Sequence, residues 1–231
     1  MNERVQSSLV GATGAGSLVQ RNTVLRNTYW LLALSLVPTV LGAWFGVSTG
    51  IVRSMGTGMS LIVFFGGAFA FIWGIERNKN SGLGVALLLG FTFFMGLMLS
   101  RLIGVVLGYA NGASLVAYAF GTTAVVFAAM ATLSTVIKKD LSGMGKFLSV
   151  GAVLLLVALL LNIFFQSSAL MLTLSVLGAG LFSAYMLYDL KRVVDGGETN
   201  YVSATLAIYL DIYNVFQFVL ALFGLGGGSN D

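Results

Sequence analysis

Residues 150–165 read VGAVLLLVALLLNIFF, and a helix built from this stretch is apolar on every face. A membrane β-strand would alternate polar and apolar side chains, so the stretch predicts a transmembrane helix. The whole chain agrees: 58% of its 231 residues are hydrophobic and only 9% are charged, against about 25% in a globular domain. We therefore expect a one-domain, all-α integral membrane protein.

Six further apolar runs, separated by polar or glycine-rich breaks, bring the expected number of transmembrane helices to seven. Each is close to the roughly 20 residues that cross a bilayer. The spans are 28–47, 57–75, 83–99, 115–137, 147–165, 170–190 and 202–223, and the third has an open end because apolar residues continue past Arg101 to Tyr109. Residues 1–26 are expected to be a flexible cytoplasmic tail, 27–224 the transmembrane domain and 225–231 a flexible C-terminal tail.

Close helix packing is expected where small residues recur four positions apart, because they let two backbones approach. Three such pairs occur: Gly42 and Gly46, Gly66 and Ala70, and Gly104 and Gly108.

The positive charges predict how the chain lies in the membrane. Ten of the twelve Lys and Arg residues fall in the N-terminal tail and in the second, fourth and sixth connections. Cytoplasmic loops are enriched in Lys and Arg, so we expect the N-terminus in the cytoplasm and the C-terminus outside. The net charge of +4 is then explained by membrane orientation and does not indicate nucleic-acid binding.

The chemistry open to this chain is narrowed by its lack of both Cys and His. Disulfides, Cys or His metal sites, a catalytic His and a haem axial His are all excluded. Carboxylates, amides, hydroxyls and guanidinium groups remain, and these suit the handling of protons and hard cations. No nucleotide or organic cofactor is expected.

Two aspartates, Asp189 and Asp211, lie inside the last two apolar runs, where a charge is expensive. In an antiparallel hairpin they reach comparable depths. Two carboxylates held together away from water cannot both ionise cheaply, so the pair is expected to share a proton and act as a pH switch. In the other reading each aspartate acts separately, and Lys191 and Arg192 neutralise Asp189 near the cytoplasmic interface.

Several motifs resemble the transmembrane Bax inhibitor motif family, bacterial branch. They are LYD at 187–189, GGETNY at 196–201 and IYLDIYNVF at 208–216, with YAFGTTAVVF at 118–127, KKDLS at 138–142 and FTF at 91–93 in support. The resemblance runs from about the first span to Phe223.

The resemblance implies a seven-helix fold in which a central seventh helix is surrounded by the other six. It also implies a pH-sensitive calcium leak in the bacterial inner membrane, with Asp189 and Asp211 as the sensor and as transient calcium contacts. Arg77 is the nearest match to a basic residue that latches onto the sixth-helix aspartate in the closed state, and Lys79 is the alternative. Both residues are equally explained by cytoplasmic positive charge alone.

Two more polar residues are candidates for the ion pathway. Arg101 stands where related proteins often have proline, so it either faces the pore and repels cations or extends to the outer interface. Asn214 follows Asp211 by three residues and so lies on nearly the same helix face.

Two other functional classes remain as alternatives. A non-transporting regulator would bind a membrane protease or another membrane protein, with the polar N-terminal tail as a natural docking segment. An intramembrane aspartyl protease also uses two aspartates on neighbouring helices, and Tyr188 precedes Asp189 as in those enzymes. The protease ranks lower because YLD at 209–211 lacks the Gly-x-Gly-Asp motif, and we do not expect an enzyme. Besides these proteins, the expected partners are the lipid bilayer, calcium and protons.

Overall fold

The computed structural model describes the backbone of residues 2–227 and the side chains of residues 21–226. Within this part of the chain all regular structure is helical. The helices are α1 (Asn2–Thr49), α2 (Ile51–Ser54), α3 (Thr57–Asn78), α4 (Gly82–Val106), α5 (Gly112–Val136), α6 (Met144–Phe165), α7 (Ser168–Val194) and α8 (Tyr201–Gly227).

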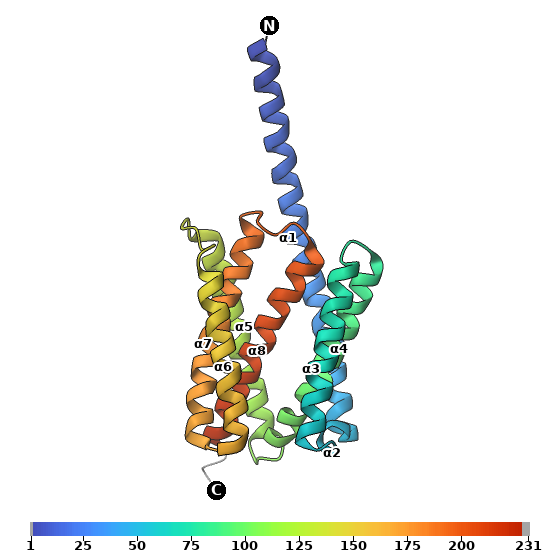
Figure 1. Cartoon of the computed structure of the whole chain (residues 1–231), viewed down its shortest axis with the longest axis vertical. Helices are drawn as coiled ribbons and strands as arrows, with labels where there is room; N and C mark the ends of the chain where they lie inside the picture. The colour runs from blue at the N-terminus through green and yellow to red at the C-terminus, as the bar shows by residue number, and fades with distance from the viewer. Residues whose placement is uncertain (1, 228–231) are drawn as a thin grey trace.

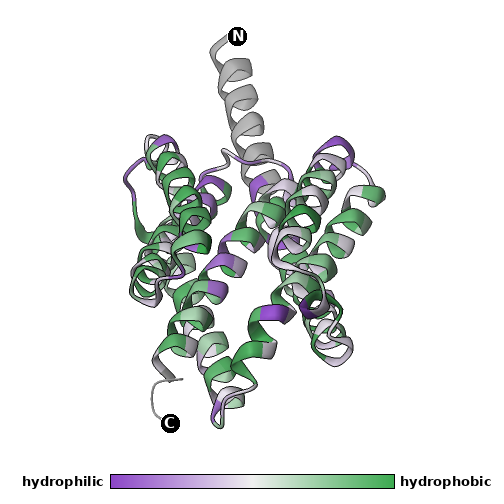
Figure 2. Cartoon of the chain, turned by 60° about the horizontal axis from the view of Figure 1, so that its bottom comes forward, coloured by the Kyte–Doolittle hydropathy of each residue, from purple (hydrophilic) through white to green (hydrophobic). Residues whose placement is uncertain are grey.

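Seven of these helices are long and apolar enough to cross a membrane, as predicted: α1 from Arg21 onward, and α3 to α8. Figure 2 shows hydrophobic residues along all of them, with polar residues gathered mostly at the loops. The third predicted span continues past Arg101 to Val106. The short helix α2 was not predicted.

The two predicted tails are described only in part. The helix α1 begins at Asn2, but the side chains of residues 1–20 are not described. At the other end α8 extends to Gly227, and residues 228–231 are not described. The assignment of residues 1–26 and 225–231 as flexible tails therefore stays a prediction.

The helices form two groups with α8 between them (Figure 1). In one group α4 packs on α1 and α3, and in the other α7 packs on α5 and α6. Helix α8 packs against five other helices: α1, α3, α4, α5 and α7. It is the most buried span, because 56% of its most apolar 18-residue stretch is buried, compared with 39% or less in the other spans. The last helix thus contributes more buried apolar residues than any other helix, while its encirclement by all six others stays a prediction.

Two glycines bring the backbones of α1 and α4 close together. A Cβ added at Gly42 would collide with the carbonyl oxygen of Phe93, and one added at Gly96 would collide with that of Thr39. Each glycine therefore leaves room for the backbone of the other helix. This contact fixes α1 against α4 over about one turn.

Of the three predicted small-residue pairs, only the first mediates a close approach along its length. A Cβ at Gly46 would collide with the side chain of Ser100 in α4. At Gly66 or Gly104 a Cβ would meet no atom within 4 Å, so the predicted close packing is wrong at these two positions. The spacing of small residues does not say which face of the helix has a neighbour.

The loops that follow α3, α5 and α7 lie at the end of the bundle from which α1 extends (Figure 1). We call it the basic end, because most of the described Lys and Arg residues lie there. The loop from α7 to α8 starts at Gly196, whose φ of 79° lies in the left-handed region that glycine adopts without strain. It ends at Asn200, whose Oδ1 accepts hydrogen bonds from the N–H groups of Val202 (2.9 Å) and Ser203 (3.2 Å) and so caps α8.

Candidate functional site

The two intramembrane aspartates lie together where α7 and α8 pack near the basic end. The side chains of Asp189 and Asp211 are within hydrogen-bonding reach of each other. Asp211 is 4% exposed, and the Asp189 side chain is 13% exposed. The structure therefore brings together the two carboxyl groups that the sequence singles out, and it buries one more deeply than the other.

Asp211 carries the most poorly satisfied polar atom of this site. Its Oδ2 is buried and, among the described residues, has no hydrogen-bond partner. An ionised carboxylate only accepts hydrogen bonds, so two carboxyl groups bond to each other only when one of them holds a proton. The geometry is suited to a pair that shares one proton, because the fully ionised pair would leave a buried charge uncompensated.

The cation next to the pair is Arg192. Its Nη1 lies 3.4 Å from Oδ1 of Asp189, and its Nη2 lies 3.5 Å from Oε2 of Glu198. Asp189 and Arg192 are three residues apart on α7, so they share a helix face. Lys191 points elsewhere and forms an ion pair with Asp195 at 2.6 Å. Of the two basic residues considered for neutralising Asp189, the structure therefore pairs only Arg192 with it.

The two candidate latch residues have other neighbours in this structure. The guanidinium group of Arg77 lies over the ring of Trp73, 5.2 Å from its centroid. Nζ of Lys79 donates to Oε2 of Glu76 at 2.9 Å, and this hydrogen bond raises the pKa of Lys79 above its usual value. Within the described residues neither cation forms an ion pair with Asp189, and a latch in another conformation stays a prediction.

Two polar residues of the α7–α8 loop were not predicted as part of the site. The backbone N–H of Asn200 donates to Oε1 of Glu198 at 2.9 Å. The Asn200 amide also donates to Oδ1 of Asn80 (2.7 Å) and to the carbonyl oxygen of Lys79 (3.3 Å) in the loop after α3. An Asn directly before an apolar run is a typical helix cap and would have predicted part of this role.

Arg101 lies away from the carboxyl pair, and the Asn214 side chain is hydrogen-bonded elsewhere. Arg101 donates to the hydroxyls of Ser60 and Thr57, both at 3.3 Å, in the first turn of α3 at the opposite end of the bundle. The Asn214 side chain donates to the carbonyl oxygen of Leu210 at 2.8 Å, within its own helix. Their roles in an ion pathway stay predictions.

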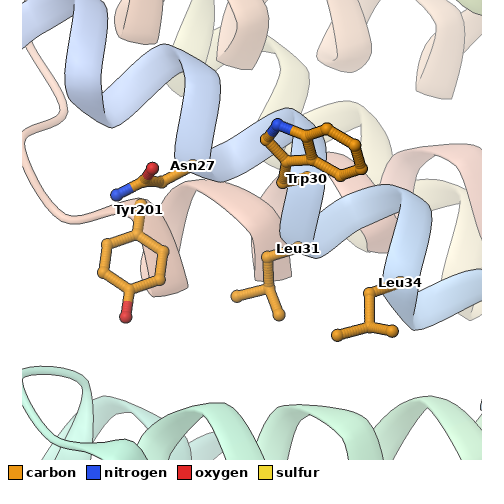
Figure 3. A pocket seen from close by; sticks show the side chains of 5 residues that line it. All are labelled: Asn27, Trp30, Leu31, Leu34 and Tyr201. Atoms are coloured by element: carbon orange, nitrogen blue, oxygen red, sulfur yellow. The ribbon is translucent and has the colours of Figure 1, made fainter.

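A second feature of the basic end is a groove of about 370 Å³ between α1 and α8. Figure 3 shows its lining, which is mostly apolar: Asn27, Trp30, Leu31 and Leu34 from α1, and Tyr201 from α8. No carboxylate is among these five residues. The groove therefore offers a hard cation no charged ligand, and the carboxyl pair is the better candidate site.

A tightly held metal ion would need more ligands than the pair offers. Within the described residues no three His, Cys, Asp or Glu side chains lie together as a metal site. Calcium takes six to eight oxygen ligands, so an ion in contact with Asp189 and Asp211 would keep much of its water. Such a site suits brief contact with a passing ion.

The chain matches the family model described as inhibitor of apoptosis-promoting Bax1 over residues 21–228. It belongs to the Bax inhibitor family. This confirms the resemblance seen in the sequence motifs, and the match covers every helix that is long enough to span a membrane.

Bacterial relatives of this Bax inhibitor family protein match it over nearly their whole length. An uncharacterized protein of Neisseria meningitidis serogroup B is 39% identical over 87% of this chain and 90% of the relative. An uncharacterized membrane protein of Vibrio cholerae is 35% identical (90% and 91%). The modulator of FtsH protease YccA of Escherichia coli K12 is 32% identical (90% and 92%). One of these relatives is named as a membrane protein and one as a modulator, and none of the three names is that of an enzyme.

Proposed function

We propose that this protein is a pH-sensitive calcium leak whose gate is the Asp189–Asp211 pair. The observation that carries the proposal is the placement of two carboxyl groups within hydrogen-bonding reach inside apolar helices, one of them with an unpaired buried oxygen. A shared proton lets the carboxyl groups bond to each other and holds α7 and α8 together. Loss of that proton replaces the bond with repulsion.

The repulsion is large enough to move a two-state equilibrium. Two unit charges about 4 Å apart repel by about 4 kcal/mol at an effective dielectric constant of 20. Every 1.4 kcal/mol changes an equilibrium constant tenfold, so deprotonation shifts the balance between closed and open packing by about 1,000-fold. The most buried helix, α8, is the element that would move.

Calcium is the proposed ion because the site offers carboxylate oxygens. Hard divalent cations prefer oxygen ligands, and a site with only two carboxylates binds too weakly to trap the ion. Calcium and protons would then compete for the same oxygens.

The proposal is tested by calcium flux into liposomes that contain the purified protein, measured across steps of pH. Asp189→Asn and Asp211→Asn are expected to remove the pH response. Glu76→Gln makes the same chemical change at a half-exposed carboxylate of α3 and should keep it. If the native protein gives no flux above that of empty liposomes at any pH, the leak proposal is wrong.

A second function is favoured by one of the comparisons. The Escherichia coli relative is named a modulator of FtsH protease, and it matches 90% of this chain. We propose as the alternative that this protein regulates a membrane protease by binding to it. Copurification of the protease with the native chain and with Asp211→Asn separates the two functions, because docking alone does not need the carboxyl pair. Loss of binding in Asp211→Asn would contradict a docking role that is independent of the pair.

A further inference from the structure

A continuous series of polar contacts leads from the buried carboxyl pair to the surface at the basic end. Asp211 faces Asp189, Asp189 faces Arg192, and Arg192 also faces Glu198. Glu198 accepts a hydrogen bond from the N–H of Asn200. The Asn200 amide then reaches the loop between α3 and α4, at residues about 120 positions away in the sequence. The contacts thus join the two groups of helices at their basic end.

The middle of this series is not tightly fixed. Charge-assisted N–H···O hydrogen bonds are usually 2.7–2.9 Å long. The two ionic contacts of Arg192 measure 3.4 Å to Asp189 and 3.5 Å to Glu198, so neither carboxylate holds it closely. Its guanidinium group also lies over the ring of Tyr188, 5.8 Å from the centroid, and this contact does not favour either carboxylate. Its side chain is 41% exposed, which leaves it room to move.

We propose that Arg192 is a positioning residue that transmits the charge of the aspartate pair to the loops at the basic end. When the pair is fully ionised, Arg192 is drawn toward Asp189 and away from Glu198. When Asp189 is neutral, Arg192 turns to Glu198 and strengthens the contact that holds the α7–α8 loop. This inference names the regulation of the proposed gate, and so it rests on the proposed function.

The other charges around Glu198 fit this role. Lys79, in the loop after α3, also interacts electrostatically with Glu198. Arg21 of α1 approaches the α7–α8 loop, with its side chain 3.7 Å from a Cβ built at Gly196. Among the described residues of α8, Asp211 is the charged residue that faces Asp189. Glu198 therefore keeps the electrostatic attraction of Lys79 when Arg192 leaves it.

The absence of cysteine from the chain makes a distance measurement direct. Ser81→Cys and Thr199→Cys place spin labels on two exposed positions, one in each loop, and neither side chain belongs to the series of contacts. The distance between the labels is measured by pulsed electron resonance in liposomes across a pH series. We expect the distance to change with pH in this background and to become constant when Asp211→Asn is added.

Arg192→Gln is expected to abolish the pH-dependent change in distance, and Glu198→Gln should do the same if the first variant does not fold. Lys191→Gln is the matched control, because Lys191 is the neighbouring cation but pairs with Asp195. It should leave the response intact. A merely structural role for Arg192 would alter the distance equally at every pH, so a pH response that survives in both Arg192→Gln and Glu198→Gln overturns the inference.

Calcium flux of the same labelled protein separates this inference from the proposed function. A pH-dependent flux with a constant distance between the loops overturns the inference and leaves the leak in place. A distance that depends on pH and on Asp211, without any flux, supports the coupling and rules out the leak.

Discussion

Replacing Asp211 by Asn is expected to stabilise the protein while it removes the proposed sensor. Oδ2 of Asp211 is buried and has no hydrogen-bond partner among the described residues. An Asn at this position would donate its amide hydrogen to Asp189 and would carry no charge into the apolar interior. At a pH at which the pair has lost its shared proton, the native carboxyl group is therefore expected to cost stability.

The size of the effect follows from the cost of an unsatisfied buried polar group, about 1–3 kcal/mol. In proteins of 150–250 residues each kcal/mol moves the melting temperature by about 2–4 °C. The expected gain for Asp211→Asn is therefore about 2–12 °C. Asp189→Asn should gain less, because the native Asp189 is already paired with Arg192 at 3.4 Å.

The assay is thermal unfolding of the purified protein in detergent at a fixed, slightly alkaline pH. Glu76→Gln is the control, since its carboxylate is 40% exposed and its pairing with Lys79 contributes at most about 1 kcal/mol. A melting temperature for Asp211→Asn that falls below that of the native protein, with the control unchanged, would refute the reasoning. It would mean that the native carboxyl group is well satisfied in the folded state.

Three further predictions concern the fold around the site. Gly96→Ala should lower the free energy of unfolding by about 1–3 kcal/mol, because its new Cβ would collide with the backbone of α1. Gly66→Ala should raise the free energy of unfolding by up to about 1 kcal/mol, because its Cβ would meet no atom within 4 Å. Thermal melts that rank the two variants in the opposite order would contradict the structure. Tyr209→Phe removes a hydroxyl that bonds to α1 and α4 and should cost about 0.5–1.5 kcal/mol by the same assay, so an unchanged melting temperature would show that these bonds contribute nothing. The backbone N–H of Ser142 donates to Asp140 and lowers the pKa of Asp140 below its ordinary value of 3.8. This hydrogen bond, which orders the α5–α6 loop, is therefore fully formed above pH 3.8 and is lost as the pH falls through the lowered pKa. Hydrogen exchange of the Ser142 amide, corrected for its intrinsic rate, tests this, and protection that disappears near neutral pH would contradict it.

The membrane spans were predictable because their signal is local. A run such as 150–165 carries its own evidence for a transmembrane helix, and the polar residues 166–168 after it mark where the helix ends. The helix α2 was missed because Ile51–Ser54 is only four residues long and too short to show a period. The close approach of α1 and α4 was only half predictable: Gly42 indicates a small-residue face, but nothing near it in the sequence identifies Gly96 as its partner.

The candidate site was likewise predictable where its signal is local and not where it depends on long-range packing. Asp189 and Asp211 were found because a charge in an apolar run is rare, and Arg192 was within reach of prediction from its spacing of three residues. The contact of Asn200 with Asn80 joins residues 120 positions apart, so it depends on how the two groups of helices assemble. Glu198 was missed because its importance comes from that assembled loop.

The position of α8 at the end of the chain has a consequence for biosynthesis. The other helices leave the ribosome first, and the faces of α1, α4, α5 and α7 that pack on α8 are in the membrane before their partner exists. During that interval Asp189 lacks the neighbouring carboxyl group of Asp211. A chain truncated before residue 201 would lack the helix on which both groups of helices pack, and such incomplete products are the kind that membrane quality control removes.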